Sequence, residues 1–301
     1  MNAPRPALER IVVGIDFKSH SIEAARWVAS VFARGAELVM THALDSRASD
    51  GTEALGAAAS DGAPDLQAVT QQLHELARAI GLHGTYRAEV REDVAARAIL
   101  AVATEVGADL IVVGPHGGRE TTRGIGTTAE RLIRMSPVPV LLVTNPRRRA
   151  PKHLLVPVDG GRLTHLVVDW AESIARRTEG EMILMHVFDP HLEDDDTSGT
   201  PRDTRWLSNL AEEGPSAVTT KSLTVVGKPA EQILAAASRL DADLVVIGRR
   251  GRRRALSGVV GSTASDLLRH SSWPVLIIVD PPDALFDEWG GHIDSPVIDS
   301  V

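Results

Sequence analysis

The chain is a tandem duplication, and this feature constrains its fold more than any other. Four blocks of the first half recur in the same order in the second half: ERIVVGID (9–16) as KHLLVPVD (152–159), ELVMTHALD (37–45) as EMILMHVFD (181–189), GADLIVVGPHG (107–117) as DADLVVIGRRG (241–251), and SPVPVLLV (136–143) as SSWPVLIIV (271–279). The offset between the blocks is 143 or 144 residues at first and 134 at the third block. The sequence therefore predicts two copies of one fold, with a deletion between the second and third blocks.

The hydrophobic pattern inside each copy indicates the fold class. Short apolar runs alternate with stretches of helical period, which is typical of βαβ units around a parallel sheet that is buried on both faces. We predict an α/β fold with two tandem domains, each a five-stranded parallel sheet flanked by helices. The predicted strands are 10–15, 37–43, 84–90, 109–114 and 138–143, then 153–158, 181–187, 218–226, 243–248 and 274–279. Residues 21–35 predict the first helix, with Gly35 as its stop.

The duplication also sets the domain boundaries. We predict a first domain at residues 1–146, a second at 151–280 and an acidic C-terminal tail at 281–301. A linker rich in proline and arginine, residues 144–152, joins the two copies. Residues 43–65 are small, polar and rich in glycine, so we expect a mobile loop there.

The composition excludes several classes of function. The formal net charge of -8 and the aromatic content of 3% argue against nucleic-acid binding, which needs cationic groups for the phosphates and rings for the bases. The absence of cysteine excludes disulfides, thiolate zinc sites and cysteine nucleophiles. The sequence shows neither a run of about 20 apolar residues nor the apolar segment of a signal peptide. We therefore expect a cytoplasmic protein that binds neither nucleic acid nor a membrane.

The second copy places an aspartate and several glycines directly after its strands. Ligands of an open parallel sheet bind beyond the carboxyl ends of the strands, so these residues are the natural candidates for a site. The glycines follow the spacing G-x2-G-x9-G-[ST] from the end of the fourth strand to the start of a helix. The candidate binding residues of this copy are Asp159, Val187, Gly248, Gly251, Gly261, Ser262 and Thr263.

This loop has the chemistry of a phosphate site. Glycines let the backbone approach phosphate oxygens, and the amides after Gly261 open a helix whose positive end faces the anion. Ser262 adds a hydroxyl donor. We expect Gly261 to adopt a conformation that only glycine readily takes.

The spacing resembles the ATP-binding motif of universal stress proteins, and the resemblance covers nearly all of both copies. It implies Rossmann-like domains of the adenine nucleotide alpha hydrolase type that bind ATP, with or without Mg²⁺. It implies that Asp159 lies by the adenine and ribose, and that Val187 contacts the adenine through its backbone. It also implies that the segments 137–143 and 273–279 pair antiparallel at the centre. We expect a homodimer of the whole chain and an unidentified regulatory protein as a partner.

The first copy carries a modified version of the motif. Its candidate binding residues are Asp16, Ala43, Gly114, Gly117, Gly126 and Thr127, followed by Thr128. Eight residues separate Gly117 from Gly126, one fewer than in the second copy. A shorter loop moves its amides relative to the phosphates, so we expect the first site to be weaker or empty.

Two further groups of residues have less specific roles. His42 and His186 occupy equivalent places on the second strand of each copy, with no carboxylate or second histidine beside them. We predict that they pack or form a hydrogen bond within the strand layer, and we predict no metal ligand. The arginines around Gly251 are Arg249, Arg250, Arg252, Arg253 and Arg254. We expect one or two of them to bind phosphate and the others to be solvated.

The leading hypothesis is a regulatory module that senses adenine nucleotide, with at most slow ATP hydrolysis and no catalytic residue. A structural stress protein with empty sites, acting through protein contacts, is the alternative. Enzymes of the related adenine-nucleotide superfamily carry S-G-G-x-D-S or H-x-G-H signatures, and neither occurs in the chain. The chain also lacks the G-x4-G-K-[ST] signature of P-loop kinases.

Overall fold

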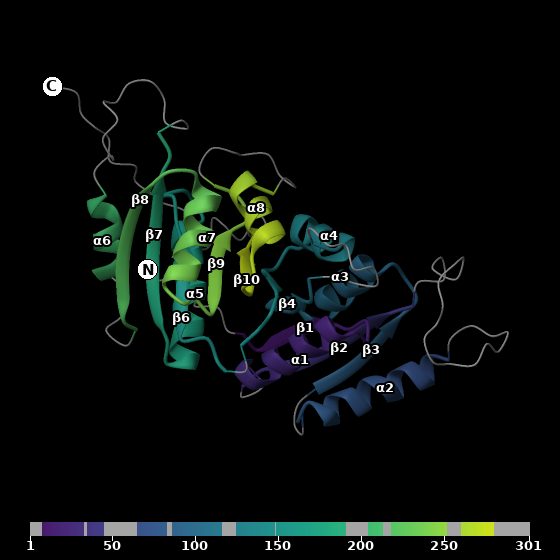
Figure 1. The fold of residues 1–301 in the computed structure, drawn as a ribbon. Helices are drawn as coiled ribbons and strands as arrows, with labels where there is room; N and C mark the ends of the chain where they lie inside the picture. Colours follow the sequence, from purple (N-terminus) through teal and green to yellow (C-terminus); the bar gives the residue numbers. More distant parts are fainter. Residues whose placement is uncertain are drawn as a thin grey trace.

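A computed structural model shows two similar α/β halves side by side (Figure 1). It describes residues 8–32, 35–44, 65–82, 86–115, 125–147, 149–190, 204–212, 218–251 and 260–279. Most of the predicted loop at 43–65 and the predicted tail at 281–301 lie outside these ranges. None of the helices that the structure describes combines the length and the hydropathy of a membrane span.

In the described part of the chain each half contributes five strands, and every predicted strand is confirmed to within two residues. The strands are β1 (Arg10–Gly14), β2 (Glu37–Ala43), β3 (Tyr86–Arg91), β4 (Leu110–Val113) and β5 (Val140–Leu142), then β6 (His153–Pro157), β7 (Glu181–Phe188), β8 (Thr220–Val226), β9 (Leu244–Gly248) and β10 (Val275–Ile278). Buried Val, Ile and Leu fill β4 and β10, because these inner strands have helices on both faces.

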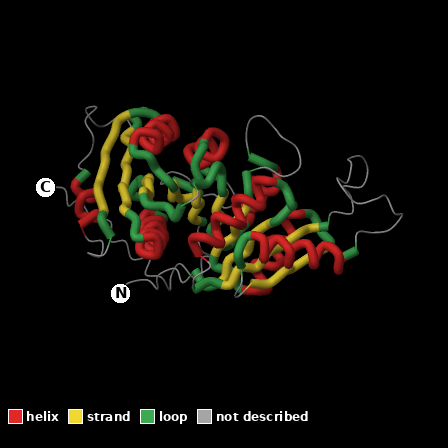
Figure 2. The backbone as a smooth tube through the Cα atoms, turned by 60° about the horizontal axis from the view of Figure 1, so that its bottom comes forward, coloured by secondary structure: helices red, strands yellow, loops and turns green. Residues whose placement is uncertain are grey.

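Helices of both halves cover both faces of the sheet, as Figure 2 shows. They are α1 (Ser19–Phe32), α2 (Leu66–Ala79), α3 (Ala95–Val106), α4 (Thr127–Met135), α5 (Thr164–Thr178), α6 (Arg205–Glu212), α7 (Pro229–Arg239) and α8 (Ser262–His270). One core cluster contains residues of α1, α2, α5 and α6, and the other contains residues of α3, α4, α7 and α8. Both clusters include strands of both copies, so the core is continuous across the centre.

The two halves join into one ten-stranded sheet of order β3-β2-β1-β4-β5-β10-β9-β6-β7-β8. All neighbours are parallel except β5 and β10, which pair antiparallel as predicted from the family resemblance. Leu141 faces Leu276, its own equivalent in the other copy, and the flanking pairs are Leu142 with Val275 and Val140 with Ile277. This self-complementary register places a local twofold axis at the pair of leucines, as in an isologous dimer interface.

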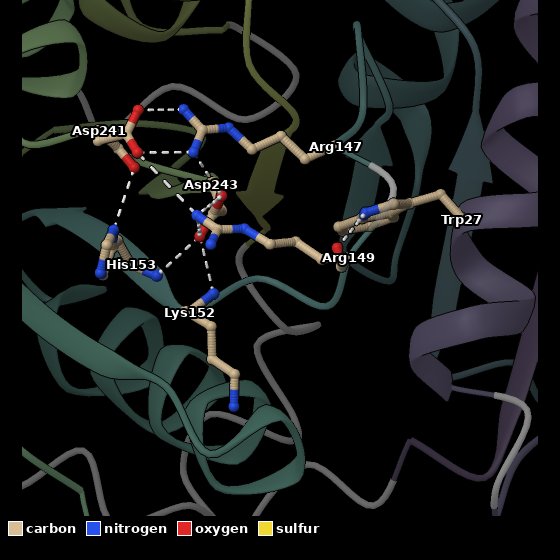
Figure 3. Close-up of polar contacts among 7 residues, drawn as sticks. All are labelled: Trp27, Arg147, Arg149, Lys152, His153, Asp241 and Asp243. Atoms are coloured by element: carbon tan, nitrogen blue, oxygen red, sulfur yellow. Dashed lines mark hydrogen bonds and ion pairs between the residues drawn. The ribbon is translucent and has the colours of Figure 1, made fainter.

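The linker between the copies forms a hydrogen bond with the first copy and ion pairs with the second (Figure 3). Trp27 of α1 donates its indole N–H to the carbonyl oxygen of Arg149 over 3.3 Å. The guanidinium of Arg149 lies 3.2 Å from Asp243 Oδ1, and Arg147 forms a two-pronged ion pair with Asp241. The arginines of the linker therefore hold it against the turn before β9, and the tryptophan holds it against the first copy.

Acid should weaken one of these ion pairs. The hydrogen bond and charge of the Arg147 guanidinium lower the pKa of Asp241 below its ordinary value. A carboxylate with a lowered pKa contributes stability above its unfolded pKa, about 3.9, and loses it as the pH falls through the folded value. We expect the small difference in urea midpoint between the wild-type chain and Asp241→Asn to be present at about pH 7 and to shrink toward about pH 3. A difference that grows on acidification would contradict this assignment.

Candidate functional site

The strand order brings the candidate residues of the second copy to one edge of the sheet. β6 lies between β7 and β9, so the segments that follow these three parallel strands are neighbours. The chain leaves β6 toward α5 on one face and leaves β9 toward α8 on the opposite face. Such a switch point opens a crevice at the carboxyl ends of the strands.

Asp159 lies between the turn after β6 and the glycine loop after β9. Its Oδ1 accepts a hydrogen bond of 2.9 Å from the amide of Gly161, across a turn in which Gly160 has a φ of +72°. Its Oδ2 lies 2.8 Å from the position that a Cβ on Gly251 would occupy. A side chain at 251 would press on this carboxylate, which would have to turn away, so glycine at 251 permits the close approach.

The last glycine of the motif begins α8. The amide of Gly261 donates to the carbonyl oxygen of Arg249 over 2.8 Å and closes the loop at its base. Gly261 has φ -63° and ψ 152°, which most residues adopt, so the expectation of a conformation special to glycine is wrong. A Cβ at this position would lie 3.3 Å from Arg249 O and 3.5 Å from the Cα of Arg250. Close packing against the loop backbone therefore explains this glycine.

The N-terminus of α8 has the features of an anion site. No side chain caps it, and the exposed Ser262 and the half-buried Thr263 form its first turn. Amides of a helical first turn have no partner inside the helix and carry partial positive charge. The structure thus places Asp159, Gly248, Gly251 and the start of α8 together at one edge of the sheet.

The backbone at Val187 faces the strand that carries Asp159. The pairing of β6 with β7 ends at Pro157 and Met185, and the Met185 carbonyl accepts from the amide of Val158. Alternate residues of a parallel strand direct their main-chain groups to opposite neighbours, so Val187 points to the same side as Met185. The peptide groups of Val187 therefore face the β6 side, beyond the last residue of β7 that pairs with β6.

Both strand histidines form the hydrogen bonds that the sequence predicted for them. His42 Nδ1 lies 2.7 Å from the carbonyl oxygen of Ile15, and His186 Nδ1 lies 3.0 Å from that of Val158. A carbonyl only accepts, so Nδ1 is the donor in both cases. The described residues include no group of three His, Cys, Asp or Glu side chains suited to a metal ion.

Aromatic side chains at this edge escaped the sequence analysis. Trp206 of α6 lies edge-on to His186, with ring centroids 5.3 Å apart, and within 4 Å of the Cβ position of Gly160. In the first copy the ring of Phe17 takes the corresponding place against His42, at 4.9 Å. Phe17 has a φ of +60° where the second copy has glycine. Only the shared contact with the histidines identifies the two rings as counterparts.

The first copy repeats part of this arrangement. Asp16 Oδ1 accepts from the amide of Lys18 over 3.0 Å and from Ser21 Oγ over 2.5 Å. Gly126 precedes α4, and its amide donates to Pro115 O over 2.7 Å, as Gly261 does to Arg249. The base of the loop is therefore the same in both copies. Gly117 and the shortened part of the loop lie outside the described residues.

The remaining candidates of the first copy follow the pattern of the second. Ala43 ends β2 beyond the pairing of Gly14 with Thr41, in the place of Val187. Gly114 follows β4, and a Cβ on it would lie 3.1 Å from the carbonyl carbon of His20. Thr127 is exposed in the first turn of α4. Apart from Gly117, the structure gathers the candidate residues of this copy at the corresponding edge of the sheet.

Arg249 is turned away from the place that a phosphate would take. Its side chain is 6% exposed, and its Nη1 donates to the carbonyl oxygens of Ile133 and Arg134 over 3.4 and 3.2 Å. The expectation that each of these arginines binds phosphate or is solvated is therefore wrong for Arg249. Residues 252–254 lie outside the described part of the chain.

Two ranges of the chain match the model of one protein family. Residues 7–144 and 151–279 each match the Universal stress protein family. The chain belongs to this family. Among curated relatives, the universal stress protein MJ0531 of Methanocaldococcus jannaschii is 25% identical over 149 residues, which cover 43% of this chain and 83% of the relative.

Solved structures support the fold of this universal stress protein over 93% to 94% of its length. A universal stress protein from Archaeoglobus fulgidus has a TM-score of 0.67 and 18% identity, with coverage of 93% of this chain and 99% of the other. The functionally unknown protein PA1789 from Pseudomonas aeruginosa has a TM-score of 0.63 and 19% identity, with coverage of 94% and 96%. At these identities the likeness concerns the fold alone.

Proposed function

We propose that this universal stress protein is an adenine-nucleotide sensor whose second copy carries the stronger ATP site. One observation carries the proposal: the Asp159 carboxylate lies against Gly251, at the loop that leads into the uncapped N-terminus of α8. The loop and helix suit the phosphates, while Asp159 and the free backbone edge at Val187 suit the ribose and the base. The proposed ligands of this site are Asp159, Val187, Gly248, Gly251, Gly261, Ser262 and Thr263.

Binding with little or no turnover suits the groups at this site. Backbone amides and hydroxyls hold phosphate oxygens without attacking them, and the described residues form no metal cluster. Any Mg²⁺ would therefore arrive with the phosphates of ATP. Slow hydrolysis and a purely structural role are the competing proposals. A cytoplasmic location, homodimerisation of the whole chain and a regulatory protein partner are further proposals.

The test is to identify small molecules released from the purified, denatured protein by mass spectrometry. We expect an adenine nucleotide at no more than about one per chain, because the first site is proposed to be weak or empty. Titration of the emptied protein with ATP, ADP and AMP then ranks the ligands. No released nucleotide together with no heat of binding would favour the structural role, and phosphate release above background would favour an enzyme.

A further inference from the structure

Arg249 belongs to the glycine loop of the second copy, but its side chain is held by the first copy. It lies between Gly248 and Gly251, and its guanidinium donates to carbonyl oxygens in the last turn of α4. Those carbonyls have no partner within their own helix, and the negative end of the helix dipole attracts a cation. The charge of Arg249 thus meets a matching group from the other half of the chain.

The backbone of Arg249 is equally fixed within the second copy. Its amide donates to the carbonyl oxygen of Ile278 over 2.7 Å, and its own carbonyl accepts the amide of Gly261 over 2.8 Å. One residue therefore links the end of β10, the start of α8 and the last turn of α4. A side chain held in this way limits how far the backbone of Arg249 can shift, and with it the carbonyl that accepts from Gly261.

The first copy lacks this connection. The residue that corresponds to Arg249 is Pro115, which has no side-chain donor. Pro115 still accepts the amide of Gly126 over 2.7 Å, so the loop closes in the same way without any hold on the partner half. At this position the second copy therefore donates hydrogen bonds to the first copy, and the first copy donates none in return.

We propose that Arg249 is a positioning residue, through which the first copy fixes the base of the glycine loop of the second copy, residues 248–251 and Gly261, for nucleotide binding. The proposal rests on the proposed nucleotide site for its functional consequence. The nucleotide site of the second copy is then completed across the boundary between the copies. The hydrogen bonds of Arg249 to α4 also give a physical reason for unequal sites that does not depend on loop length.

The test compares Arg249→Met, which keeps much of the side-chain volume but has no donor, with Arg269→Met on the exposed last turn of α8. Hydrogen exchange of the nucleotide-free protein should show the Gly261 amide exchanging at least about 10-fold faster in Arg249→Met. The Gly126 amide is the internal control and should be unchanged. Arg269→Met should leave both amides as they are, and Arg249→Lys should restore part of the protection because it retains a cationic donor.

The functional readout is the affinity of the same variants for ATP. We expect a loss of about 10-fold in Arg249→Met, equivalent to one decade in Kd. The proposal would be overturned if the Gly261 amide of Arg249→Met exchanged at the wild-type rate. It would also be overturned if the Gly126 amide of this variant exchanged faster to the same extent. If the wild-type chain does not bind ATP, the proposed function fails, while the exchange data still decide the role of Arg249. Should Arg249→Met not fold, Arg249→Gln, which loses the charge, is compared with Arg249→Lys, which retains it, and the Gly261 amide should exchange faster in Arg249→Gln.

Discussion

Replacing Gly261 by valine is expected to lower the affinity of the chain for ATP by about 100-fold, which corresponds to about 2.8 kcal/mol. Valine adopts the φ and ψ of this position, so α8 should still form. Its Cβ would press on Arg249 O at 3.3 Å and on the Cα of Arg250 at 3.5 Å, and its two methyl groups would add to the crowding. The loop must then move, and its amides would leave the geometry that the phosphates require.

Gly126→Val is the matched control, because Gly126 precedes α4 with nearly the same dihedral angles and the same closing hydrogen bond. We expect this change to lower ATP affinity by less than about 3-fold, or about 0.7 kcal/mol, since the first site is proposed to be weak or empty. Calorimetric titration of both variants measures the two effects. Equal losses, or a loss confined to Gly126→Val, would show that the proposed asymmetry between the copies is wrong.

Asp243→Ala is expected to lower the free energy of unfolding by about 3 kcal/mol. The Asp243 side chain is 2% exposed, and its Oδ2 accepts the amides of Lys152 and His153 over 2.8 and 3.1 Å. Alanine would leave both half-buried amides without this acceptor, and an unsatisfied buried group costs about 1–3 kcal/mol. The variant would also remove the carboxylate that holds Arg149, and so loosen the linker.

Asp109→Ala is the control for this change in the first copy. Asp109 accepts the amides of Glu9 and Arg10 over 2.7 and 2.9 Å, in the same arrangement. It is only partly buried, so water can replace the carboxylate, and we expect a loss of about 1 kcal/mol. Urea unfolding of both variants, read by circular dichroism, measures the difference. A larger loss from Asp109→Ala would contradict the role given to burial and to the linker.

The antiparallel pairing of β5 with β10 follows in part from the duplication. Two copies of one fold need an interface, and an inherited dimer interface places equivalent residues opposite each other. The pairing of Leu141 with Leu276 meets that expectation. The family resemblance supplied which strands would pair, and the structure supplied the register.

The residues that the sequence analysis missed act over long separations in the chain. Trp206 reaches a turn at Gly160, and Trp27 binds a carbonyl at Arg149. Nothing in the local pattern around a tryptophan on a helix distinguishes such a contact from ordinary core packing. Arg249 was expected at a phosphate or in solvent, because its place among glycines and arginines matches a phosphate loop.

The sequence by itself determined the elements, their order and the edge of the sheet where the candidate site lies. Periodicity and turn residues are local, and in a parallel sheet the carboxyl ends of strands necessarily meet at one edge. Only the tertiary structure decided which way each side chain at that edge points. Asp159 faces Gly251 because the segments after β6 and β9 are neighbours, and Arg249 faces α4 because the antiparallel pairing of β5 with β10 brings the first copy within its reach. Such directions depend on packing between distant segments, which local sequence patterns do not encode.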